Sequence, residues 1–365
     1  MRPTKRNRIG LGIIGAGRVG LIRGEIAARF PQVDFVGIAE RRPERAALVA
    51  GKISADFVTS DYQQLLARPE ITAVVISTDE HLHVEPILAA AERGVAMMIE
   101  KPLATELADS ARVLKAIEAR RVDAVVGYTQ RFRQRWLTAK EKVRTGALGE
   151  VTMATSRGFM NRLVAIDNYQ RTSNPKAISP MVVSGTHALD LVLWILEGKK
   201  PAEVYARSVD KALGPKYRGI DGTAGLITME DGTLYHLSIS WALPVAWPGA
   251  VYSLEVGLVG TEGVLTVDDT HRDVWLNTVA GGTVFPMSTM PGEQVDHVYA
   301  GAMGPETVHF LEAVVCNRPV MVTPESARVV MEIYTAADLS AERNAPVDLP
   351  LSNEAMSAIA AGARR

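Results

Sequence analysis

The amino-acid sequence predicts an α/β domain with a doubly wound parallel sheet, followed by an α+β domain with a large, mostly antiparallel sheet. Through about residue 127, short apolar runs alternate with helical patterns, which is typical of parallel strands joined by crossover helices. From Val151 onwards, strand patterns follow one another directly, with hairpin signals such as Asp231-Gly232 between them. We therefore expect two domains, at residues 1–128 and 129–365.

The first predicted strand, residues 9–14, runs into a glycine-rich turn and then into a helix at 21–29. The turn is Gly15-Ala16-Gly17-Arg18-Val19-Gly20, and a G-x-G-x-x-G between a strand and a helix is typical of dinucleotide binding. Gly15 permits the tight turn, Gly17 lets a pyrophosphate approach, and Gly20 allows the helix to pack closely on the sheet. Amides at the helix start would hold the anion. A glycine-rich turn without a ligand is the alternative.

The second predicted strand, 35–39, ends at Glu40, about 20 positions after Gly20, where a carboxylate can accept hydrogen bonds from both ribose hydroxyls. Such a carboxylate would repel a 2′-phosphate, which favours NAD. Arg41 and Arg42 follow at once and favour the opposite choice, because they could pair with a 2′-phosphate, or Arg41 could lie over the adenine. We expect NAD, with NADP as the alternative.

The next elements continue the alternation up to the most informative stretch, Glu100-Lys101-Pro102. Proline cannot donate to a sheet ladder, so the apolar strand before it must stop and present Lys101 at its carboxyl end. Open parallel sheets bind ligands at this edge, where a lysine can act as acid, base or hydrogen-bond donor. A surface lysine beside a strand end is the alternative. The other predicted elements are helices at 45–52, 61–67, 84–93 and 106–119 and strands at 73–78 and 124–128.

The chain resembles the Gfo/Idh/MocA family of dinucleotide-dependent oxidoreductases over nearly its whole length. The resemblance rests on the glycine turn, Ser77 to His83, Glu100-Lys101-Pro102, Gly127 to Phe132 and Gly146 to Glu150, in that order. It implies a Rossmann domain and places Lys101 near the nicotinamide and the reacting carbinol. The cofactor contacts we expect are Gly15, Ala16, Gly17, Arg18, Val19, Glu40, Arg41, Ser77, Thr78, His83, Glu100, Lys101 and Arg131.

His81 and His83 flank a single residue, a spacing sometimes used for metals. No third ligand is positioned to complete a site, so we expect no metal. His83 is instead expected to cap or orient the loop beside the nicotinamide.

The C-terminal half contains predicted strands at 151–156, 202–208, 225–229, 233–241, 251–259 and 263–267 and helices at 305–313 and 325–343. The family resemblance implies that this sheet carries subunit contacts, in a homodimer or homotetramer. The apolar strand residues fit such contacts or the protein's own core equally well; they are Leu237, Ile239, Trp241, Leu254 and Val256.

His187 and Asp190 are three positions apart near the start of a predicted helix, so they share one helix face. A histidine there could take the proton from a substrate hydroxyl as hydride leaves its carbon; a helix-capping histidine with a structural aspartate is the alternative. The resemblance supports the catalytic assignment. Many polyol-oxidising relatives have an aspartate four positions before that histidine, where this chain has Val183, so the usual proton relay is incomplete. Either the expected catalytic residues Lys101 and His187 manage the proton with Asp190, or the protein handles a different substrate, or it has lost the chemistry.

A polar stretch at residues 157–171, predicted as a loop, has the mixed donors and acceptors that suit a polyhydroxylated ligand, and equally an ordinary solvated loop. Tyr235, Trp241 and Trp247 could line the pocket, although aromatics in strands are more often core. The substrate contacts we expect are Lys101, Tyr128, Arg157, Asn161, Arg171, Thr186, His187 and Asp190.

Composition excludes several classes of function. The chain has 365 residues with 47% hydrophobic and 22% charged residues, a net charge of −1 and one cysteine. The charge gives no reason to expect nucleic acid or a membrane surface as partner, and no disulfide can form within the chain. Composition is consistent with a cytoplasmic protein, and the family resemblance implies an NAD(P)-dependent dehydrogenase of a sugar, inositol or related polyol. The alternatives are a non-redox NAD(P)- or sugar-binding regulatory member and an NAD-dependent glycosidase.

Overall fold

The protein is described by a computed structural model covering residues 8–171, 178–217, 219–244, 252–268, 274, 276–284, 291–352, 355–356 and 359. The chain divides into two compact units. The first consists of Met1–Phe132 and Met290–Val329, and the second of Arg133–Thr289 and Val330–Arg365. Each unit has its own sheet. No helix in the described ranges is long and apolar enough to cross a membrane.

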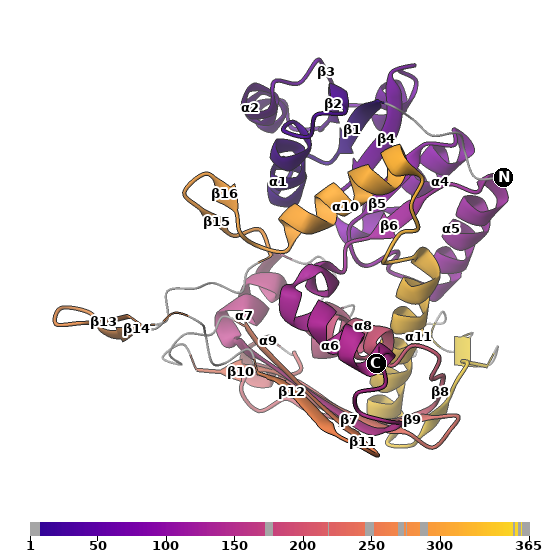
Figure 1. Cartoon of the computed structure of the whole chain (residues 1–365), viewed down its shortest axis with the longest axis vertical. Coiled ribbons are helices and arrows are strands. Elements are labelled where there is room, and N and C mark those ends of the chain that lie inside the picture. Colours follow the sequence, from indigo (N-terminus) through magenta and orange to yellow (C-terminus); the bar gives the residue numbers. More distant parts are fainter. Residues whose placement is uncertain are drawn as a thin grey trace. The chain divides into compact units, whose positions relative to one another are not determined.

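The first unit is built on a six-stranded parallel sheet with the order β3-β2-β1-β4-β5-β6 (Figure 1). Every residue of β1, β5 and β6 is buried, which explains their continuous apolar sequences. The predicted doubly wound parallel sheet is confirmed. The strands are β1 (Ile9–Ile14), β2 (Val33–Ala39), β3 (Phe57–Thr59), β4 (Ile71–Ile76), β5 (Ala96–Ile99) and β6 (Ala124–Val126).

The helices of this unit follow from the strand order. Crossovers run from β1 towards β3 and from β4 towards β6, and because crossovers are right-handed, the two sets of helices cover opposite faces. The helical elements are α1 (Arg18–Ala27), α2 (Pro43–Ile53), α3 (Tyr62–Leu66), η1 (Glu80–Leu82), α4 (Val84–Glu92), α5 (Leu107–Arg120), η2 (Thr129–Phe132) and α10 (Met303–Cys316). A hairpin of β15 (Gln294–Val295) and β16 (Val298–Tyr299) precedes α10.

The division of the chain differs from the predicted one, in which residues 129–365 formed a single domain. Residues 290–329 belong to the first unit. Met303 at the start of α10 forms an apolar cluster with Ile22 and Ile26 of α1. The amide of Val126 in β6 also donates to the carbonyl of Val322 at 3.1 Å. Neither contact has a local sequence signal.

The second unit contains a seven-stranded sheet with the order β12-β11-β7-β10-β9-β8-β17. Only the β7–β10 pair is parallel among the paired strands of this sheet, so the mostly antiparallel sheet is confirmed. The strands are β7 (Val151–Asn161), β8 (Pro201–Val209), β9 (Gly222–Met229), β10 (Leu234–Leu243), β11 (Tyr252–Gly260), β12 (Val264–Asp268) and β17 (Val347–Asp348). A separate hairpin joins β13 (Leu276–Thr278) and β14 (Gly282–Val284).

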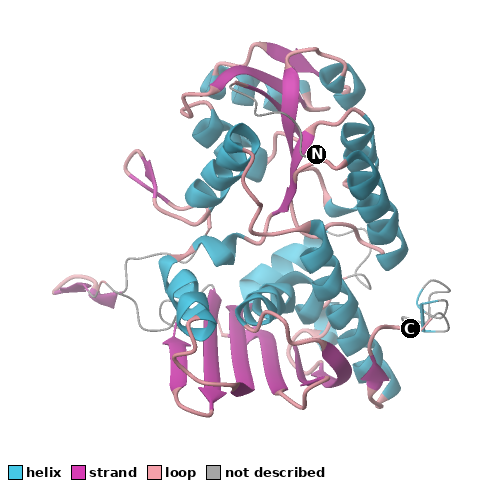
Figure 2. Ribbon diagram, turned by 45° about the vertical axis from the view of Figure 1, so that its right-hand side comes forward, coloured by secondary structure: helices cyan, strands magenta, loops and turns pink. Residues whose placement is uncertain are grey.

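Helices lie over one face of this sheet (Figure 2). They are α6 (Gln134–Arg144), α7 (Arg162–Arg171), the π-helical turn η4 (Met181–Gly185), α8 (Thr186–Ile195), the short α9 (Gly214–Tyr217) and α11 (Pro324–Arg343), whose later part belongs to this unit. The five apolar strand residues that fitted either a core or a subunit contact are at most 3% exposed, so they are core. They are Leu237, Ile239, Trp241, Leu254 and Val256.

Residues 157–171 are not the loop that the sequence predicts. They complete β7 and form α7. Ala165 and Tyr169, one helical turn apart, pack with Leu213 and Trp241 in an apolar cluster, and this burial outweighs the polar composition of the segment. Tyr235 and Trp241 are fully buried, whereas Trp247 lies outside the described residues.

Candidate active site

The glycine turn between β1 and α1 has the geometry expected of a phosphate-binding turn. Gly15 has φ +88°, and a Cβ there would lie 2.7 Å from the carbonyl oxygen of Ser77. A Cβ at Gly20 would lie 2.2 Å from the carbonyl oxygen of Gly15. At Gly17, in contrast, a Cβ would meet no atom within 4 Å. The turn is thus closed towards the sheet and open where an anion would approach the start of α1. Arg18 is exposed and Val19 half-buried on the first turn of that helix.

Arg45, which sequence reasoning did not assign to the site, holds the carbonyl side of this turn. From the first turn of α2, its Nε donates to the carbonyl oxygen of Ala16 at 2.6 Å and its Nη2 to that of Gly17 at 2.8 Å. The guanidinium presents parallel donors in a fixed geometry. It therefore fixes two successive peptide planes, and with them the direction of the amides. An arginine at this position gives no local signal, since many helices begin with charged residues.

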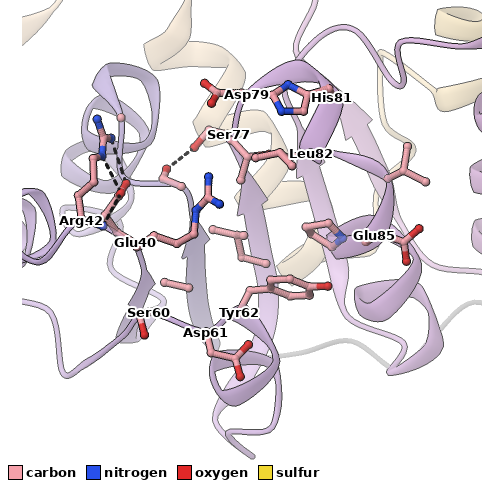
Figure 3. A pocket seen from close by; sticks show the side chains of 18 of the residues that line it. Glu40, Arg42, Ser60, Asp61, Tyr62, Ser77, Asp79, His81, Leu82 and Glu85 are labelled. Atoms are coloured by element: carbon pink, nitrogen blue, oxygen red, sulfur yellow. Dashed lines mark hydrogen bonds and ion pairs between the residues drawn. The ribbon is translucent and has the colours of Figure 1, made fainter. Parts of the chain in front are cut away.

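Glu40, at the end of β2, is buried with both carboxylate oxygens engaged. Oε2 accepts from the amide of Ala16 at 3.0 Å. Oε1 accepts from Nε of Arg42 at 2.9 Å, and Figure 3 shows this pair. Burial would raise the pKa of Glu40, but the hydrogen bonds from Arg42 and Ala16 outweigh it, so the pKa is lowered and the group is ionised. Arg41 is exposed, and no residue in the described ranges pairs with it.

A cavity of about 1000 Å³ extends from the glycine turn along the carboxyl ends of β1, β2 and β4 (Figure 3). Its walls include Glu40, Arg41, Ser77 and Thr78, all predicted, and Tyr62, which was not. Ser77 Oγ donates to the carbonyl oxygen of Gly15 at 2.7 Å. Thr78 Oγ1 is buried without a hydrogen-bond partner among the described residues. An open glycine cradle, a carboxylate and a hydroxyl without a partner fit a dinucleotide.

Lys101 follows β5 at the carboxyl edge of the same sheet. It is half-buried, and no hydrogen bond or ion pair joins its Nζ to any residue in the described part of the chain. Structural ammonium groups with this burial are usually paired. Lys101 is therefore free to donate to a ligand, although it is not among the residues that line the cavity.

His83 ties two backbone segments of this edge together. Its Nδ1 lies 2.8 Å from the carbonyl oxygen of Pro102, and its Nε2 lies 3.1 Å from that of Thr78. The ring is buried. His83 thus joins the residue after Lys101 to the end of β4 and orients the loop, and it is not among the residues that line the cavity.

Two predicted contacts lie deeper in the first unit. Arg131 is 4% exposed and donates to the carbonyl oxygen of Met321 at 2.8 Å, so it joins η2 to the segment before α11. Tyr128 is 1% exposed. Neither residue lines the cavity. Both positions match a support role for the loop after β6 better than contact with a ligand in that cavity.

In the second unit, His187 lies in the first turn of α8, directly after the π-helical turn η4. The widened turn of a π-helix is frequent at functional sites. His187 is half-buried, whereas Thr186 and Asp190 are 1% and 0% exposed. Of these three predicted residues, only His187 has exposed surface for a ligand. Because Asp190 is fully buried, it can act on a ligand only through a neighbouring group.

Val183 lies within η4 and packs against the apolar cluster that contains Tyr169 and Trp241. Nearby, Trp241 Nε1 donates to Ser184 Oγ at 2.8 Å, which satisfies the one polar group of the ring. A carboxylate at position 183 would therefore lie against apolar side chains. Position 183 is thus partly buried against an apolar cluster and carries no carboxylate.

Two of the three remaining predicted substrate residues, Arg157 and Asn161, have structural partners. Arg157 on β7 pairs across the sheet with Glu255 on β11, with its Nη2 2.5 Å from both carboxylate oxygens. Asn161 Oδ1 accepts from the amide of Leu163 at 2.9 Å and so caps the start of α7. The side chain of Arg171 lies outside the described residues. Arg157 and Asn161 are thus occupied in holding strand and helix, a use that polar composition alone does not reveal.

Comparisons with known proteins agree with this geometry. Residues 9–128 match the family model of the GFO/IDH/MocA oxidoreductases with an NAD-binding Rossmann fold, and residues 136–266 match the GFO/IDH/MocA C-terminal domain. YrbE of Bacillus subtilis, an uncharacterized oxidoreductase, is 26% identical over 93% of this chain and 96% of its own. The scyllo-inositol 2-dehydrogenase (NAD(+)) of the same organism is 24% identical over 92% of this chain and 95% of its own.

Among solved structures, the scyllo-inositol dehydrogenase of Lactobacillus casei with bound NAD(H) and scyllo-inositol has a TM-score of 0.80 to this chain. The match covers 93% of this chain and 99% of that one, at 21% identity. The two proteins share a fold.

Proposed function

The chain belongs to the Gfo/Idh/MocA family of NAD-binding oxidoreductases, and we propose that it is a dehydrogenase of a sugar, inositol or related polyol. The reaction moves a hydride between a secondary alcohol carbon and nicotinamide, and the hydroxyl proton leaves to a protein group. The observation that carries the proposal is Lys101, a half-buried ammonium without a partner among the described residues, at the edge of the sheet that also forms the dinucleotide cavity. The inositol dehydrogenases among the relatives support the substrate class.

Each residue has a separate role in this proposal. Bound NAD supplies the hydride acceptor. Lys101 donates a hydrogen bond to the substrate oxygen and stabilises the negative charge that develops there as the carbon is oxidised. His187 accepts the hydroxyl proton. Asp190, which is fully buried, orients His187 and does not hold a substrate hydroxyl. Because Val183 stands where the family resemblance implies a relay aspartate, Lys101 and His187 manage the proton with Asp190 in this proposal.

We also propose that NAD is preferred to NADP. Glu40 is ionised at the cavity wall, where a carboxylate attracts ribose hydroxyls and repels a 2′-phosphate. Arg41 and Arg42 could oppose this preference by pairing with a 2′-phosphate, but the two side chains are not equally available. Arg42 is already paired with Glu40, whereas Arg41 has no partner in the described part of the chain and can lie over the adenine.

A homodimer or homotetramer through the second sheet completes the proposal. Strand register places the exposed Met153, Val259 and Val264 on one face, because Val259 pairs with both of the others. Tyr205 and Leu226 pair on the same sheet and are also exposed. An apolar face of this kind fits burial against a second copy. Light scattering coupled to gel filtration tests it: a monomer at micromolar concentration would refute this part.

The test of the activity is a panel of sugars and inositols with NAD or NADP, followed by absorbance of reduced nicotinamide. Lys101→Ala is the test variant and Lys115→Ala is the matched control, because Lys115 on α5 is exposed and has no partner among the residues that the structure describes. We expect turnover with NAD in the wild type and in the control, and a loss of about 100-fold or more in Lys101→Ala.

Other outcomes of this test are equally informative. Calorimetric NAD binding with no turnover on any alcohol or ketone would refute the dehydrogenase and favour a binding protein. Tightly bound NAD with cleavage of a glycoside, and no net reduction of added NAD, would favour the glycosidase alternative. Faster turnover with NADP than with NAD would refute the assignment of Glu40.

A further inference from the structure

A buried cluster of charged side chains joins three elements of the first unit. Arg23, on the second turn of α1, is completely buried. Its Nε donates to Oε1 of Glu100 at 2.6 Å, and its Nη2 donates to Oε2 of Glu306 on α10 at 2.8 Å. Its Nη1 donates to Oγ1 of Thr307 at 3.1 Å. One guanidinium thus links α1, the end of β5 and α10.

The donors and acceptors of the cluster are mutually consistent. Thr307 Oγ1 donates to the carbonyl oxygen of Met303 at 2.7 Å, so its lone pair is available to Arg23. Burial would lower the pKa of Arg23, but Glu100 and Glu306 outweigh it and raise the pKa, so the group is charged. Five donors in a rigid plane suit partners in three directions, which a lysine ammonium on a flexible stem does not.

The cluster connects two parts of the candidate site in the first unit, the glycine turn and Lys101. Arg23 is on the helix that begins at the glycine turn, and Glu100 directly precedes Lys101. The Glu100 carboxylate is also confined from another side, because a Cβ at Gly127 would lie 3.0 Å from Oε2. The Glu100 amide donates to the carbonyl oxygen of Ile76 at 2.9 Å. Both ends of Glu100 are therefore fixed.

We propose that Arg23 is a positioning residue that holds Glu100, and through it Lys101, in a fixed place relative to the glycine turn. Glu306 is the second counter-charge that keeps Arg23 in place. The segment 290–329 thereby supports the reaction without touching a ligand. This inference rests on the proposed dehydrogenase, and its test includes one measurement that does not depend on turnover.

The physical reason is the sensitivity of hydride transfer to geometry. A displacement of about 1 Å in a reacting group, caused from a distance, can lower a rate about 100-fold. Arg23 does not line the dinucleotide cavity. Its removal should therefore change kcat much more than the affinity for NAD, which a general loss of stability would not do.

The experiment compares Arg23→Lys, Arg23→Met, Glu306→Gln and the double variant that combines Arg23→Met with Glu306→Met. Arg29→Lys is the matched control, because Arg29 follows the same helix and also reaches the 290–329 segment, donating to the carbonyl oxygen of His297 at 3.0 Å. We expect Arg23→Lys to lower kcat about 10- to 100-fold and to leave the calorimetric Kd for NAD within about threefold. Arg29→Lys should match the wild type in both.

The double variant separates positioning from stability. It replaces the fully buried Arg23–Glu306 pair by two apolar side chains of similar length, which proteins often accept. The Glu100 carboxylate, with 14% of its side chain exposed, then has no arginine partner in the cluster. We expect its melting temperature to exceed that of Arg23→Met alone while its kcat stays as low as that of Arg23→Lys. A double variant with wild-type kcat would overturn the inference, as would an Arg23→Lys variant with wild-type kcat. Glu306→Gln should fold, and its kcat should lie between that of the wild type and that of Arg23→Lys.

A measurement on Lys101 itself distinguishes failure of this inference from failure of the proposed function. The rate at which an acylating reagent modifies Lys101 is followed by peptide mass spectrometry in each full-length variant. We expect Arg23→Lys to change that rate about threefold or more relative to Arg29→Lys. Equal rates would overturn the inference, whether or not the wild type turns over any polyol. A changed rate in a protein that oxidises no polyol would support the inference and refute only the dehydrogenase.

Discussion

Replacing Arg45 by alanine should weaken NAD binding without unfolding the chain. Arg45 donates two charge-assisted hydrogen bonds to the carbonyl oxygens of Ala16 and Gly17, and a bond to a charged group is worth about 1.5–3 kcal/mol. Other contacts continue to hold the beginning of the turn, since the amide of Gly15 donates to the carbonyl oxygen of Ala39 at 2.9 Å. We therefore expect the equivalent of about one bond to be lost, which is a rise in Kd of roughly 10- to 100-fold.

Isothermal titration calorimetry with NAD measures this effect directly, and thermal unfolding without NAD shows whether the fold is kept. Lys52→Ala is the matched control, because Lys52 is an exposed cation on the same helix without a partner among the described residues. Arg45→Lys should lie between alanine and the wild type, since an ammonium cannot bond two carbonyls in parallel. A wild-type Kd in a folded Arg45→Ala variant would refute the view that this residue preorganises the turn.

Three further predictions concern the glycine cradle, the packed position 183 and a hairpin. Gly17→Ala should raise the Kd for NAD about 10-fold or more, whereas Gly51→Ala, at an equally open position in α2, should leave it unchanged. The same calorimetric Kd in both variants would count against phosphate binding at the glycine turn. Val183→Asp should lower the free energy of unfolding in urea by about 1–3 kcal/mol without raising turnover, because the carboxylate enters an apolar cluster; a gain in turnover would show that position 183 faces the substrate. In the β9–β10 turn, hydrogen bonds from Lys199 and from the amide of Thr233 lower the pKa of Asp231 to about 2 from 3.8. The lowered pKa stabilises the folded state above pH 3.8, and this stabilisation is lost as the pH falls towards 2. Asp231→Asn should therefore reduce the fall in the free energy of unfolding between pH 3.8 and pH 2. The same fall in the variant and the wild type would contradict this.

Short-range features of the sequence determined much of the first unit. A strand, a glycine turn and a helix within residues 9–27 are specified by neighbours in the chain, so the turn and its open side at Gly17 follow from spacing alone. The Asp231-Gly232 hairpin is specified in the same way, as is the end of β5 before Pro102. Glu40 at the cavity wall also follows from the βαβ pattern, because the length of the unit fixes where its second strand ends.

Only the tertiary structure decided the partners of these residues. Arg23 and Glu306 are separated by 283 positions, and Arg45 meets the glycine turn from another helix. Residues 157–171 have a polar composition, yet Ala165 and Tyr169 pack on Trp241 and make part of the segment a helix. Val183 faces the same cluster. Local patterns report the conformation of a few adjacent residues, whereas ion pairs and core contacts depend on which distant segments the fold brings together, and no local pattern encodes that choice.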